Sequence, residues 1–221
     1  MNTPLPRTGA LRDAQQGLAT RWATLDTMQV AAAFGDAEAA RLNEAGIGDL
    51  GFRRRTGVKG RNARFWLNAL GVATPERPNQ WLALPCGSLV ARLGDTEYAL
   101  VAGADAQTVT RVATAAPSHG VYPVPRFDAD LLLAGRRVPE LLAQTCAFDF
   151  GGLDAATRPL VMTSMVGVGV TVLALPGADG PRYRLWCDGT YGGYLWRTLT
   201  GLAGELGGGA VGLDTLGALA R

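Results

Sequence analysis

Glycines provide the first pattern in this chain with a possible chemical meaning. The spacing G-x-G-x-x-G occurs twice, at Gly46, Gly48 and Gly51 and again at Gly207, Gly209 and Gly212. A dinucleotide site needs such glycines between a strand and the helix whose N-terminus faces the pyrophosphate. The first set follows an expected helix and precedes a strand, and the second has almost no chain after it. We interpret both as chance matches in a chain with 30 glycines.

Side chains that could act as acids, bases or metal ligands are sparse. His119 is the only histidine and stands in a Pro-Ser-His-Gly turn, so multi-histidine metal sites are excluded and we expect an exposed loop residue. Four acidic residues stand near expected strand and helix ends, and we expect them to cap these ends rather than form an acid–base pair: Asp128, Asp130, Asp149 and Asp154. Three separated cysteines without a C-x-x-C pair favour reduced, mostly buried thiols: Cys86, Cys146 and Cys187.

Two groups of residues are candidates for a partner surface. One is a dense positive cluster of Arg53, Arg54, Arg55 and Lys59. It would meet an acidic partner or a polyglutamate tail, or it is only the solvated face of a strand, and both interpretations stay open. The other group is aromatic and lies near the C-terminus: Tyr183, Trp186, Tyr191, Tyr194 and Trp196. Most of these rings should be core, yet aromatic residues also anchor interfaces, which makes Tyr191, Tyr194 and Trp196 interface candidates.

Length and composition limit the classes of protein to which this chain can belong. A chain of 221 residues with 48% hydrophobic content can bury its apolar surface in one core or in two closely fused ones. Its formal net charge of +2 is too small to imply a nucleic acid or an anionic membrane as partner. The N-terminus lacks the apolar core of a signal peptide, and the longest uncharged run, residues 160–175, is too short for a membrane span. We expect a cytoplasmic protein.

The elements that must position these residues occur twice along the chain. Gly57–Val72 and Leu131–Cys146 both read as the end of an apolar strand, a glycine and an amphipathic helix. A hairpin and a second helix follow each of them; the hairpins are Ser88–Gly103 and Val168–Cys187. Such a duplicated pattern predicts an α+β fold of two ferredoxin-like βαββα halves that share sheets.

The repeat also suggests boundaries. Gly60 matches Gly135 at an offset of 75 residues, and Tyr98 matches Tyr183 at an offset of 85. We expect one body over residues 21–221, with pseudo-repeats at about 47–116 and 127–206. Residues 1–20 should form a flexible or loosely docked arm. Helices are expected at Leu18–Phe34, Asp36–Ala45, Arg61–Leu70 and Ala104–Ala116, and a final one at Tyr191–Leu206.

Four stretches together resemble the folate-binding domain of the aminomethyltransferase family. They are GDLGFRRRTGVKGRNARFWLNALGV, SLVARLGDTEYALVAG, ELLAQTCAFDF and VTVLALPGADGPRYRLWCDGTYGGYLWRTL, between about Ile47 and Leu206. Each motif is loose and mostly structural. Within the family, the chain is similar to the short gamma subunit of heterotetrameric sarcosine oxidase. The resemblance implies the same duplicated α+β fold that the repeat predicts.

The chain departs from the family at two positions that would carry function. The family has a pair of aspartates just before the strand that matches Leu89–Leu93, where this chain has Cys86, Gly87 and Ser88. The family also has a G-Y-T-G-E turn, whose glutamate holds the pterin of tetrahydrofolate, before the strand that matches Tyr183–Cys187. This chain has PGADGP there, with Asp179 as the one possible acid. Both acidic sites of the family are therefore expected to be lost in this chain.

The resemblance and these losses imply a subunit without its own chemistry. We expect a non-catalytic gamma-type subunit of a cytoplasmic, heteromeric, flavin-dependent sarcosine or N-methyl amino acid oxidase or dehydrogenase, beside larger flavoprotein subunits. Flavin and tetrahydrofolate would belong to those partners, and this chain would bind no cofactor and no metal. The alternative is a free-standing tetrahydrofolate-binding, aminomethyltransferase-like protein.

Overall fold

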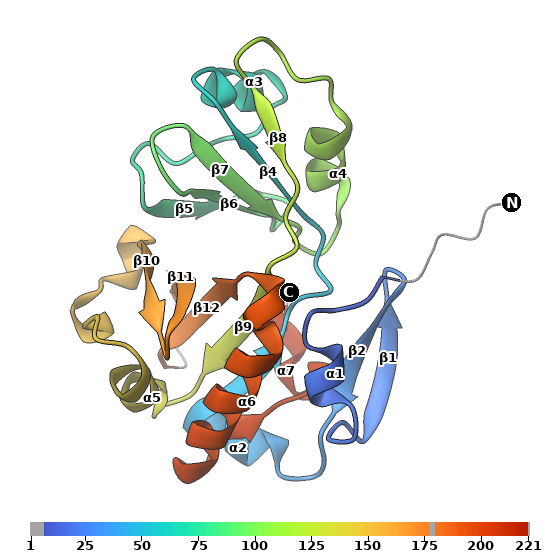
Figure 1. The fold of residues 1–221 in the computed structure, drawn as a ribbon, viewed down its shortest axis with the longest axis vertical. Helices are drawn as coiled ribbons and strands as arrows, with labels where there is room; N and C mark the ends of the chain where they lie inside the picture. The colour runs from blue at the N-terminus through green and yellow to red at the C-terminus, as the bar shows by residue number, and fades with distance from the viewer. Residues whose placement is uncertain (1–6, 177–179, 221) are drawn as a thin grey trace, which may run out of the picture. The chain divides into compact units, whose positions relative to one another are not determined.

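The computed structural model describes residues 7–176 and 180–220, which form two compact units of mixed helix and strand (Figure 1). Unit 1 comprises Met1–Phe52, Asp128–Leu153 and Met162–Ala220, as far as these segments are described. Unit 2 comprises Arg53–Phe127 and Asp154–Val161. Each unit is organised around its own sheet, and the single body predicted for residues 21–221 stays a prediction.

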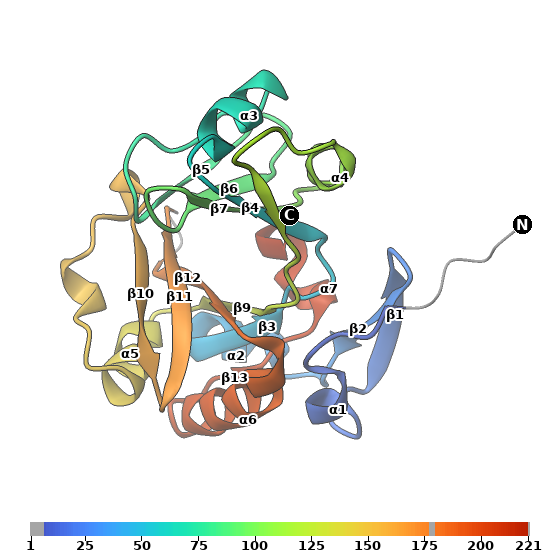
Figure 2. The ribbon, with the colours of Figure 1, turned by 45° about the horizontal axis from the view of Figure 1, so that its top comes forward.

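Unit 1 is built on a six-stranded sheet with the order β10-β11-β12-β9-β3-β13. These strands are β3 (Gly46–Asp49), β9 (Ala129–Ala134), β10 (Leu160–Met165), β11 (Val168–Leu175), β12 (Arg182–Cys187) and β13 (Gly209–Ala210). The helices are α1 (Arg12–Gln15), α2 (Glu38–Ala45), α5 (Val138–Thr145), α6 (Gly189–Glu205) and α7 (Leu213–Leu216), with 3-10 turns η1 (Phe150–Gly152) and η3 (Gly217–Ala220). Helices α5 and α6 lie on one face of the sheet and α7 on the other (Figure 2).

Unit 2 is built on a five-stranded antiparallel sheet with the order β5-β6-β7-β4-β8. Its elements are β4 (Arg55–Lys59), α3 (Ala63–Ala69), β5 (Gln80–Ala83), β6 (Leu89–Arg92), β7 (Glu97–Val101), α4 (Gln107–Thr114), β8 (Tyr122–Val124) and η2 (Ala155–Thr157). Val58 and Leu100 from the sheet share one buried cluster with Trp66 of α3 and Val109 of α4. Both helices therefore cover the same face of the sheet, and apolar burial holds them there.

The two sheets repeat one topology, which confirms the duplicated α+β fold. The order β5-β6-β7-β4 in unit 2 corresponds to β10-β11-β12-β9 in unit 1. The register agrees as well, because Val58 faces Tyr98 in unit 2 while Leu133 faces Tyr183 in unit 1. These pairs are related by the offsets of 75 and 85 residues found in the sequence. The strand before each repeat is exchanged, since β3 pairs with β9 and β8 pairs with β4.

Equivalent glycines open the turn from the first strand of each repeat into its helix. Gly60 has φ +125° and Gly135 has φ +131°, a region that side chains other than hydrogen rarely allow. A Cβ at Gly60 would lie 2.1 Å from the Gly120 carbonyl oxygen, and one at Gly135 would lie 2.4 Å from the Glu44 carbonyl oxygen. Both turns therefore require glycine, for the conformation and for the close approach of a neighbouring backbone.

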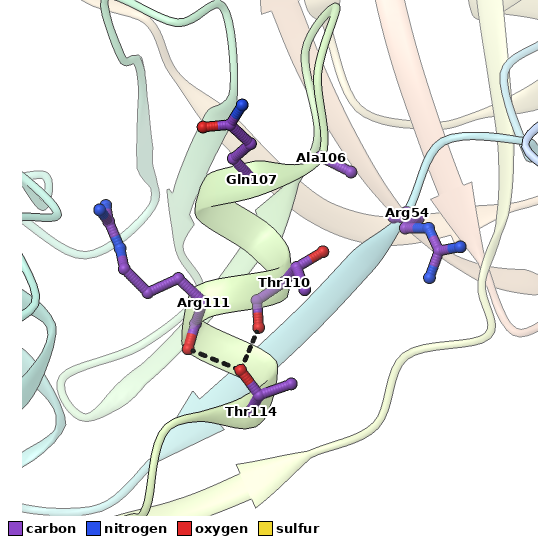
Figure 3. A pocket seen from close by; sticks show the side chains of 6 residues that line it. All are labelled: Arg54, Ala106, Gln107, Thr110, Arg111 and Thr114. Atoms are coloured by element: carbon purple, nitrogen blue, oxygen red, sulfur yellow. Dashed lines mark hydrogen bonds between the residues drawn. The ribbon is translucent and has the colours of Figure 1, made fainter.

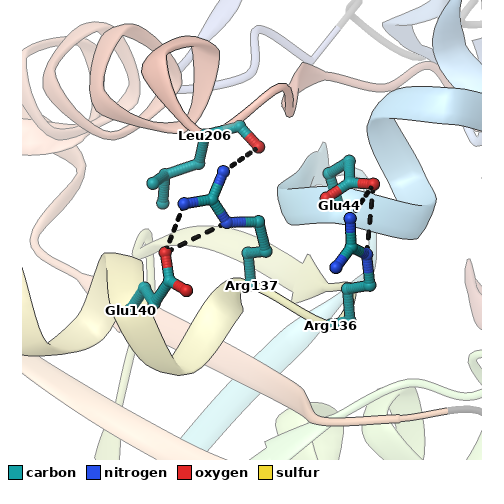
Figure 4. Close-up of polar contacts among 5 residues, drawn as sticks. All are labelled: Glu44, Arg136, Arg137, Glu140 and Leu206. Atoms are coloured by element: carbon teal, nitrogen blue, oxygen red, sulfur yellow. Dashed lines mark hydrogen bonds and ion pairs between the residues drawn. The ribbon is translucent and has the colours of Figure 1, made fainter.

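Two arginines after Gly135 fasten the helices of unit 1 together (Figure 4). The Arg136 guanidinium pairs with Glu44 at the end of α2, at 2.7 Å. Arg137 bonds Glu140 in the first turn of α5 at 2.6 Å, and it donates to the Leu206 carbonyl after α6 at 3.2 Å. A cation at the C-terminal end of a helix also interacts favourably with the helix dipole. The turn thus ties α2, α5 and α6 to one point of the sheet.

Most predicted elements of the repeats are present. Helix α3 lies within the predicted Arg61–Leu70, α4 lies within Ala104–Ala116, and α6 covers nearly all of Tyr191–Leu206. The two hairpins are β6–β7 and β11–β12. The three cysteines are free thiols as predicted, with Cys146 and Cys187 buried and Cys86 partly exposed. In the part of the chain that the structure describes, no helix is both long and apolar enough to span a bilayer.

The N-terminal prediction was wrong from Leu18 to Phe34. A hairpin of β1 (Arg21–Leu25) and β2 (Met28–Ala33) replaces the predicted helix. Asp26 and Thr27 between these strands have φ of 45° and 66°, a two-residue turn of the kind that joins twisted strands and that no helix can contain. The described part of the predicted arm also packs, because Leu11 is only 1% exposed and α1 contacts α6.

Candidate functional site

Asp130 and Arg184 form a buried ion pair on the sheet of unit 1. Nε of Arg184 donates to Oδ1 of Asp130 at 2.8 Å, and Nη2 donates to Oδ2 at 2.5 Å. The Asp130 side chain is 0% exposed and that of Arg184 is 9% exposed. Two charges leave water here only because each satisfies the other in a bidentate geometry.

The sheet register explains how the two side chains meet. Asp130 on β9 faces Trp186 on β12, and Arg184 faces Leu132, so the charged pair is diagonal on one sheet face. The Arg184 guanidinium also lies 5.9 Å from the centre of the Trp186 ring. On the same face, Leu216 of α7 and Leu132 belong to one apolar cluster. The pair therefore lies on the sheet face that also carries α7.

The prediction that Asp130 caps an element was wrong, whereas it was right for two other acids. Asp130 lies within β9, where its carboxylate faces a guanidinium rather than free backbone N–H groups. Asp149 accepts from Gly151 N at the start of η1, and Asp154 accepts from Ala156 N at the start of η2. Both oxygens of Asp130 accept from Arg184, so this carboxylate is not placed to take a proton from a substrate. The sequence did contain a signal for this ion pair, namely one acid in the apolar strand β9 and one arginine in the apolar strand β12.

The predicted positive cluster does not form one surface. Arg53 is 6% exposed and donates to the carbonyls of Ala102 and Gly103 at 2.7 and 2.5 Å. Arg54 is exposed beside α4, whereas Arg55 and Lys59 are on β4 and share its opposite face. Successive residues of an extended chain point to opposite sides, which separates these neighbours. Arg53 is therefore corrected to a packing residue, while Arg54, Arg55 and Lys59 stay interface candidates.

The aromatic candidates on α6 divide between the core and the surface. Trp196 is 0% exposed and stacks in a tilted arrangement on Phe34, with ring centres 5.8 Å apart. The prediction that Trp196 contacts a partner was therefore wrong, because its ring lies within the core of unit 1. Tyr191 and Tyr194 are 55% and 47% exposed, and the Tyr194 hydroxyl donates to the Val166 carbonyl at 3.1 Å. These two tyrosines stay candidates for a partner surface.

The remaining predicted residues do not assemble into a catalytic group. His119 is exposed as expected, and its Nε2 lies 2.9 Å from Arg61 Nη2. Asp179, the candidate for folate binding, lies outside the described residues. Gly46 and Gly48 are part of β3, after α2, so the first glycine pattern has no dinucleotide geometry. Across residues 7–176 and 180–220, no three His, Cys, Asp or Glu side chains are grouped as metal ligands.

Neighbouring hydrogen-bonding groups stabilise the thiolate form of Cys86. Hydrogen bonds from the side chain and backbone of Ser88, and then from Thr108, lower the pKa of Cys86 below its usual 9.0. Its Sγ lies 3.6 Å from Thr108 Oγ1. Burial, followed by the charges of Asp128 and Asp188, instead raises the pKa of Cys187 to about 11. Spacing of the cysteines gave no indication of this difference, which depends on local donors and burial.

A shallow, open hollow of about 650 Å³ lies on α4 in unit 2 (Figure 3). Its lining residues are Arg54, Ala106, Gln107, Thr110, Arg111 and Thr114. The four polar residues of α4 recur at spacings of three and four, which puts them on one side of the helix. The charged groups in the lining are the guanidinium groups of Arg54 and Arg111.

Comparisons with known proteins identify the fold. No family model and no curated protein matches the sequence. Among solved structures, the chain is similar to glycine cleavage system aminomethyltransferase T from Bartonella henselae, with a TM-score of 0.67 and 14% identity over 95% of this chain and 60% of that chain. The chain thus spans about 60% of the length of that protein.

A second similar structure is heterotetrameric sarcosine oxidase from Corynebacterium sp. U-96, in complex with pyrrole 2-carboxylate. Its TM-score is 0.63 with 18% identity, over 79% of this chain and 91% of that chain. At such identities a likeness shows the fold, and activity has to be argued from the site.

Proposed function

We propose that this chain is a non-catalytic, gamma-type subunit of a heteromeric flavin-dependent oxidase or dehydrogenase for sarcosine or another N-methyl amino acid. The observation that carries the proposal is its structural likeness to one chain of a heterotetrameric sarcosine oxidase, over 79% of this chain and 91% of that one. Because 79% of this chain corresponds to 91% of that one, the two are of similar size. The aminomethyltransferase, by contrast, is matched over 60% of its length.

The acidic residues of the described chain support a role without chemistry of its own. Asp130 is occupied by Arg184, and Glu38 accepts from the backbone N–H groups of Phe34 and Gly212. Asp149, Asp154 and Asp188 accept from backbone N–H groups at the starts of η1, η2 and α6. Carboxylates engaged in this way stabilise the fold, and they are poorly placed to act on a bound substrate.

The cofactors of the complex would then belong to its larger subunits. The family's pair of aspartates is replaced here by Cys86, Gly87 and Ser88, and the turn whose glutamate holds the pterin is replaced by PGADGP, in which Asp179 is the one acid. In this proposal the chain completes the assembly beside the folate-binding subunit and binds neither flavin nor tetrahydrofolate.

Affinity purification from the source cell tests the proposal. The tagged full-length chain should elute with larger chains, and the eluate should show flavin absorbance. Replacement of Tyr191 and Tyr194 by serine should reduce this co-elution, because exposed aromatic residues anchor interfaces. Tyr122→Ser is the matched control, since Tyr122 is 59% exposed in unit 2. A monodisperse monomer with no flavoprotein partner would contradict the proposal.

The alternative is a free-standing tetrahydrofolate-binding protein related to the aminomethyltransferases. It is favoured by the match to aminomethyltransferase T over 95% of this chain. Calorimetric titration of the isolated chain with tetrahydrofolate distinguishes the two functions. Heat that disappears in an Asp179→Asn variant would support the alternative, and absence of both heat and a change in melting temperature would remove it.

A further inference from the structure

The longest uncharged run of the chain, residues 160–175, forms a hairpin at the margin of the six-stranded sheet. Strands β10 and β11 both lie within this run. β10 is the outer strand of the sheet and lies beside β11 (Figure 2). An edge strand leaves the N–H and C=O groups of alternate residues unpaired, and these groups can pair with a further strand.

The other outer strands of the two main sheets are short, covered or interrupted by proline. β13 has two residues, and the three-residue strand β8 contains Pro123. The outer side of β5 is covered, because Gln80 pairs with Pro159 and the Asn79 carbonyl accepts from Leu160 N at 2.9 Å. Among the outer strands that the structure describes in these sheets, β10 alone combines six residues with no charge and no proline. Charges and prolines prevent unwanted pairing of edge strands, so their absence favours pairing at β10.

The side chains of β10 alternate between a covered and an exposed face. Thr163 lies on the covered face, where its Oγ1 is 3.7 Å from Sγ of Cys146 at the end of α5. Met162 is 53% exposed, and Ser164 is exposed on the same face. Apart from the pairing with β11, residues 161–165 form no backbone hydrogen bond to another part of the described chain. The outer side of this segment is therefore accessible.

We propose that β10 pairs, antiparallel and about a two-fold axis, with β10 of a second copy of this chain. Charge matching selects this occupant. A charged strand would lose hydration at this uncharged margin without gaining an ion pair, whereas a copy of β10 opposes no like charges.

The symmetry of this arrangement limits the assembly to two chains. An axis at Thr163 places Met162 of one copy opposite Ser164 of the other, so the exposed residues of both copies meet on one face. Each copy offers one such edge, and the pairing closes at the dimer. The inference goes beyond the proposed function, because the pairing needs no other protein.

Sedimentation velocity of the isolated full-length chain tests the inference. The chain should show a monomer–dimer equilibrium between about 1 and 100 μM, without larger species. Ser164→Lys should raise the dissociation constant of the dimer about ten-fold or more, because it brings two like charges together across the axis. Ser164→Val keeps the strand uncharged and should change the constant by less than about three-fold. A chain that stays monomeric throughout this range would overturn the inference.

Matched substitutions separate pairing at β10 from other causes of association. Thr24→Lys adds the same charge at an exposed position of β1 and should change the dissociation constant by less than about two-fold. Met162→Lys repeats the test at the second exposed position if Ser164→Lys lowers the melting temperature. Equal weakening by Thr24→Lys and by the β10 variants would overturn the inference. So would a dimer that Tyr191→Ser with Tyr194→Ser abolishes while the β10 variants keep it, because that dimer would form through α6. The isolated chain serves throughout, so the result is independent of any flavoprotein partner.

Discussion

Arg184 binds both carboxylate oxygens of Asp130 from the neighbouring strand, at 2.8 and 2.5 Å. The equivalent positions in unit 2, at the offsets of 75 and 85, are Arg55 and Ala99, so the other repeat has no such pair. The two repeats thus share a backbone and a register while differing in polar content. Because only one repeat has the buried ion pair, the shared topology does not require it. The contribution of the pair to the free energy of unfolding can therefore be tested by substitution.

Breaking this pair from either side should destabilise the protein strongly. Asp130→Asn or Arg184→Met leaves one buried charge without its partner, which costs about 3–5 kcal/mol of unfolding free energy. Replacing both residues together with Leu and Met should recover much of that loss, because neither charge then remains buried. Urea unfolding of the three variants measures the coupling.

An exposed pair provides the control. Glu140→Gln removes the ion pair between Glu140 and Arg137, whose two side chains are 55% and 33% exposed, respectively. The change should lower the free energy of unfolding by less than about 1 kcal/mol. If Asp130→Asn costs no more than this control, the buried pair contributes little.

The equivalent turn glycines should not tolerate a methyl group. Gly60→Ala and Gly135→Ala combine a φ above +120° with a Cβ within 2.4 Å of a backbone oxygen, so each should cost about 2 kcal/mol or more. Gly201→Ala is the matched control, because Gly201 lies in α6 with no atom within 4 Å of its added Cβ. That change should stabilise by about 0.5–1 kcal/mol through helix propensity. Thermal unfolding distinguishes the signs.

The repeat could be predicted because its signals are local and occur twice. A glycine between an apolar strand and an amphipathic helix identifies the turn at Gly60, and its second occurrence at Gly135 fixes the offset. The register of the paired strands agrees with these offsets, because Val58 faces Tyr98 in unit 2 and Leu133 faces Tyr183 in unit 1. The exchange of β3 and β8 between the sheets could not be predicted, because it depends on contacts far apart in the sequence.

Other features depended on contacts that a sequence pattern does not contain. The alanine-rich segment around Ala31 favours a helix by propensity, yet Asp26 and Thr27 form a hairpin turn without the Asn-Gly or Asp-Gly signal. Asp130 resembled a cap because it begins an apolar strand, and its partner is 54 residues away. The predicted arginine cluster does not form one surface, because neighbouring residues of an extended chain point in opposite directions.

The turn between β10 and β11 contains a strained valine. Val166 has φ 44° and Gly167 has φ 83°, a two-residue turn with both residues in the left-handed region. The turn is held by Val166 N donating to the Thr145 carbonyl and by the Tyr194 hydroxyl donating to the Val166 carbonyl. A β-branched residue there costs about 1–2 kcal/mol. Val166→Asn gives the favoured Asn-Gly turn and should raise the melting temperature, whereas a decrease would show that the valine side chain packs.

Alkaline pH should destabilise the fold through Cys187. Burial raises its pKa from 9.0 to about 11, so between these values the unfolded chain loses a proton that the folded chain keeps. The contribution of the Cys187 thiol to the free energy of unfolding is fully present below about pH 9 and is lost as the pH rises through about 11. The total loss is of the order of 2 kcal/mol. Burial also raises the pKa of Tyr183, so its contribution has the same sign.

Urea unfolding at a series of alkaline pH values tests this dependence. Cys187→Ala should flatten the curve above pH 9 without abolishing it, because Tyr183 remains. A slope that is unchanged in the Cys187 variant would remove this thiol as the cause.

Cys86 should be the first thiol to react with an alkylating agent near neutral pH. Its pKa is lowered by Ser88 and Thr108, and it is partly exposed, whereas Cys146 and Cys187 are buried. Because the thiolate is the nucleophile, iodoacetamide should label Cys86 at least about ten-fold faster than the other two thiols, as peptide mass spectrometry would show. Thr108→Val removes one donor to the sulfur and should slow labelling at fixed pH while the folded core is kept. Labelling of Cys187 before Cys86 would contradict both the burial and the hydrogen bonds that separate the two thiols.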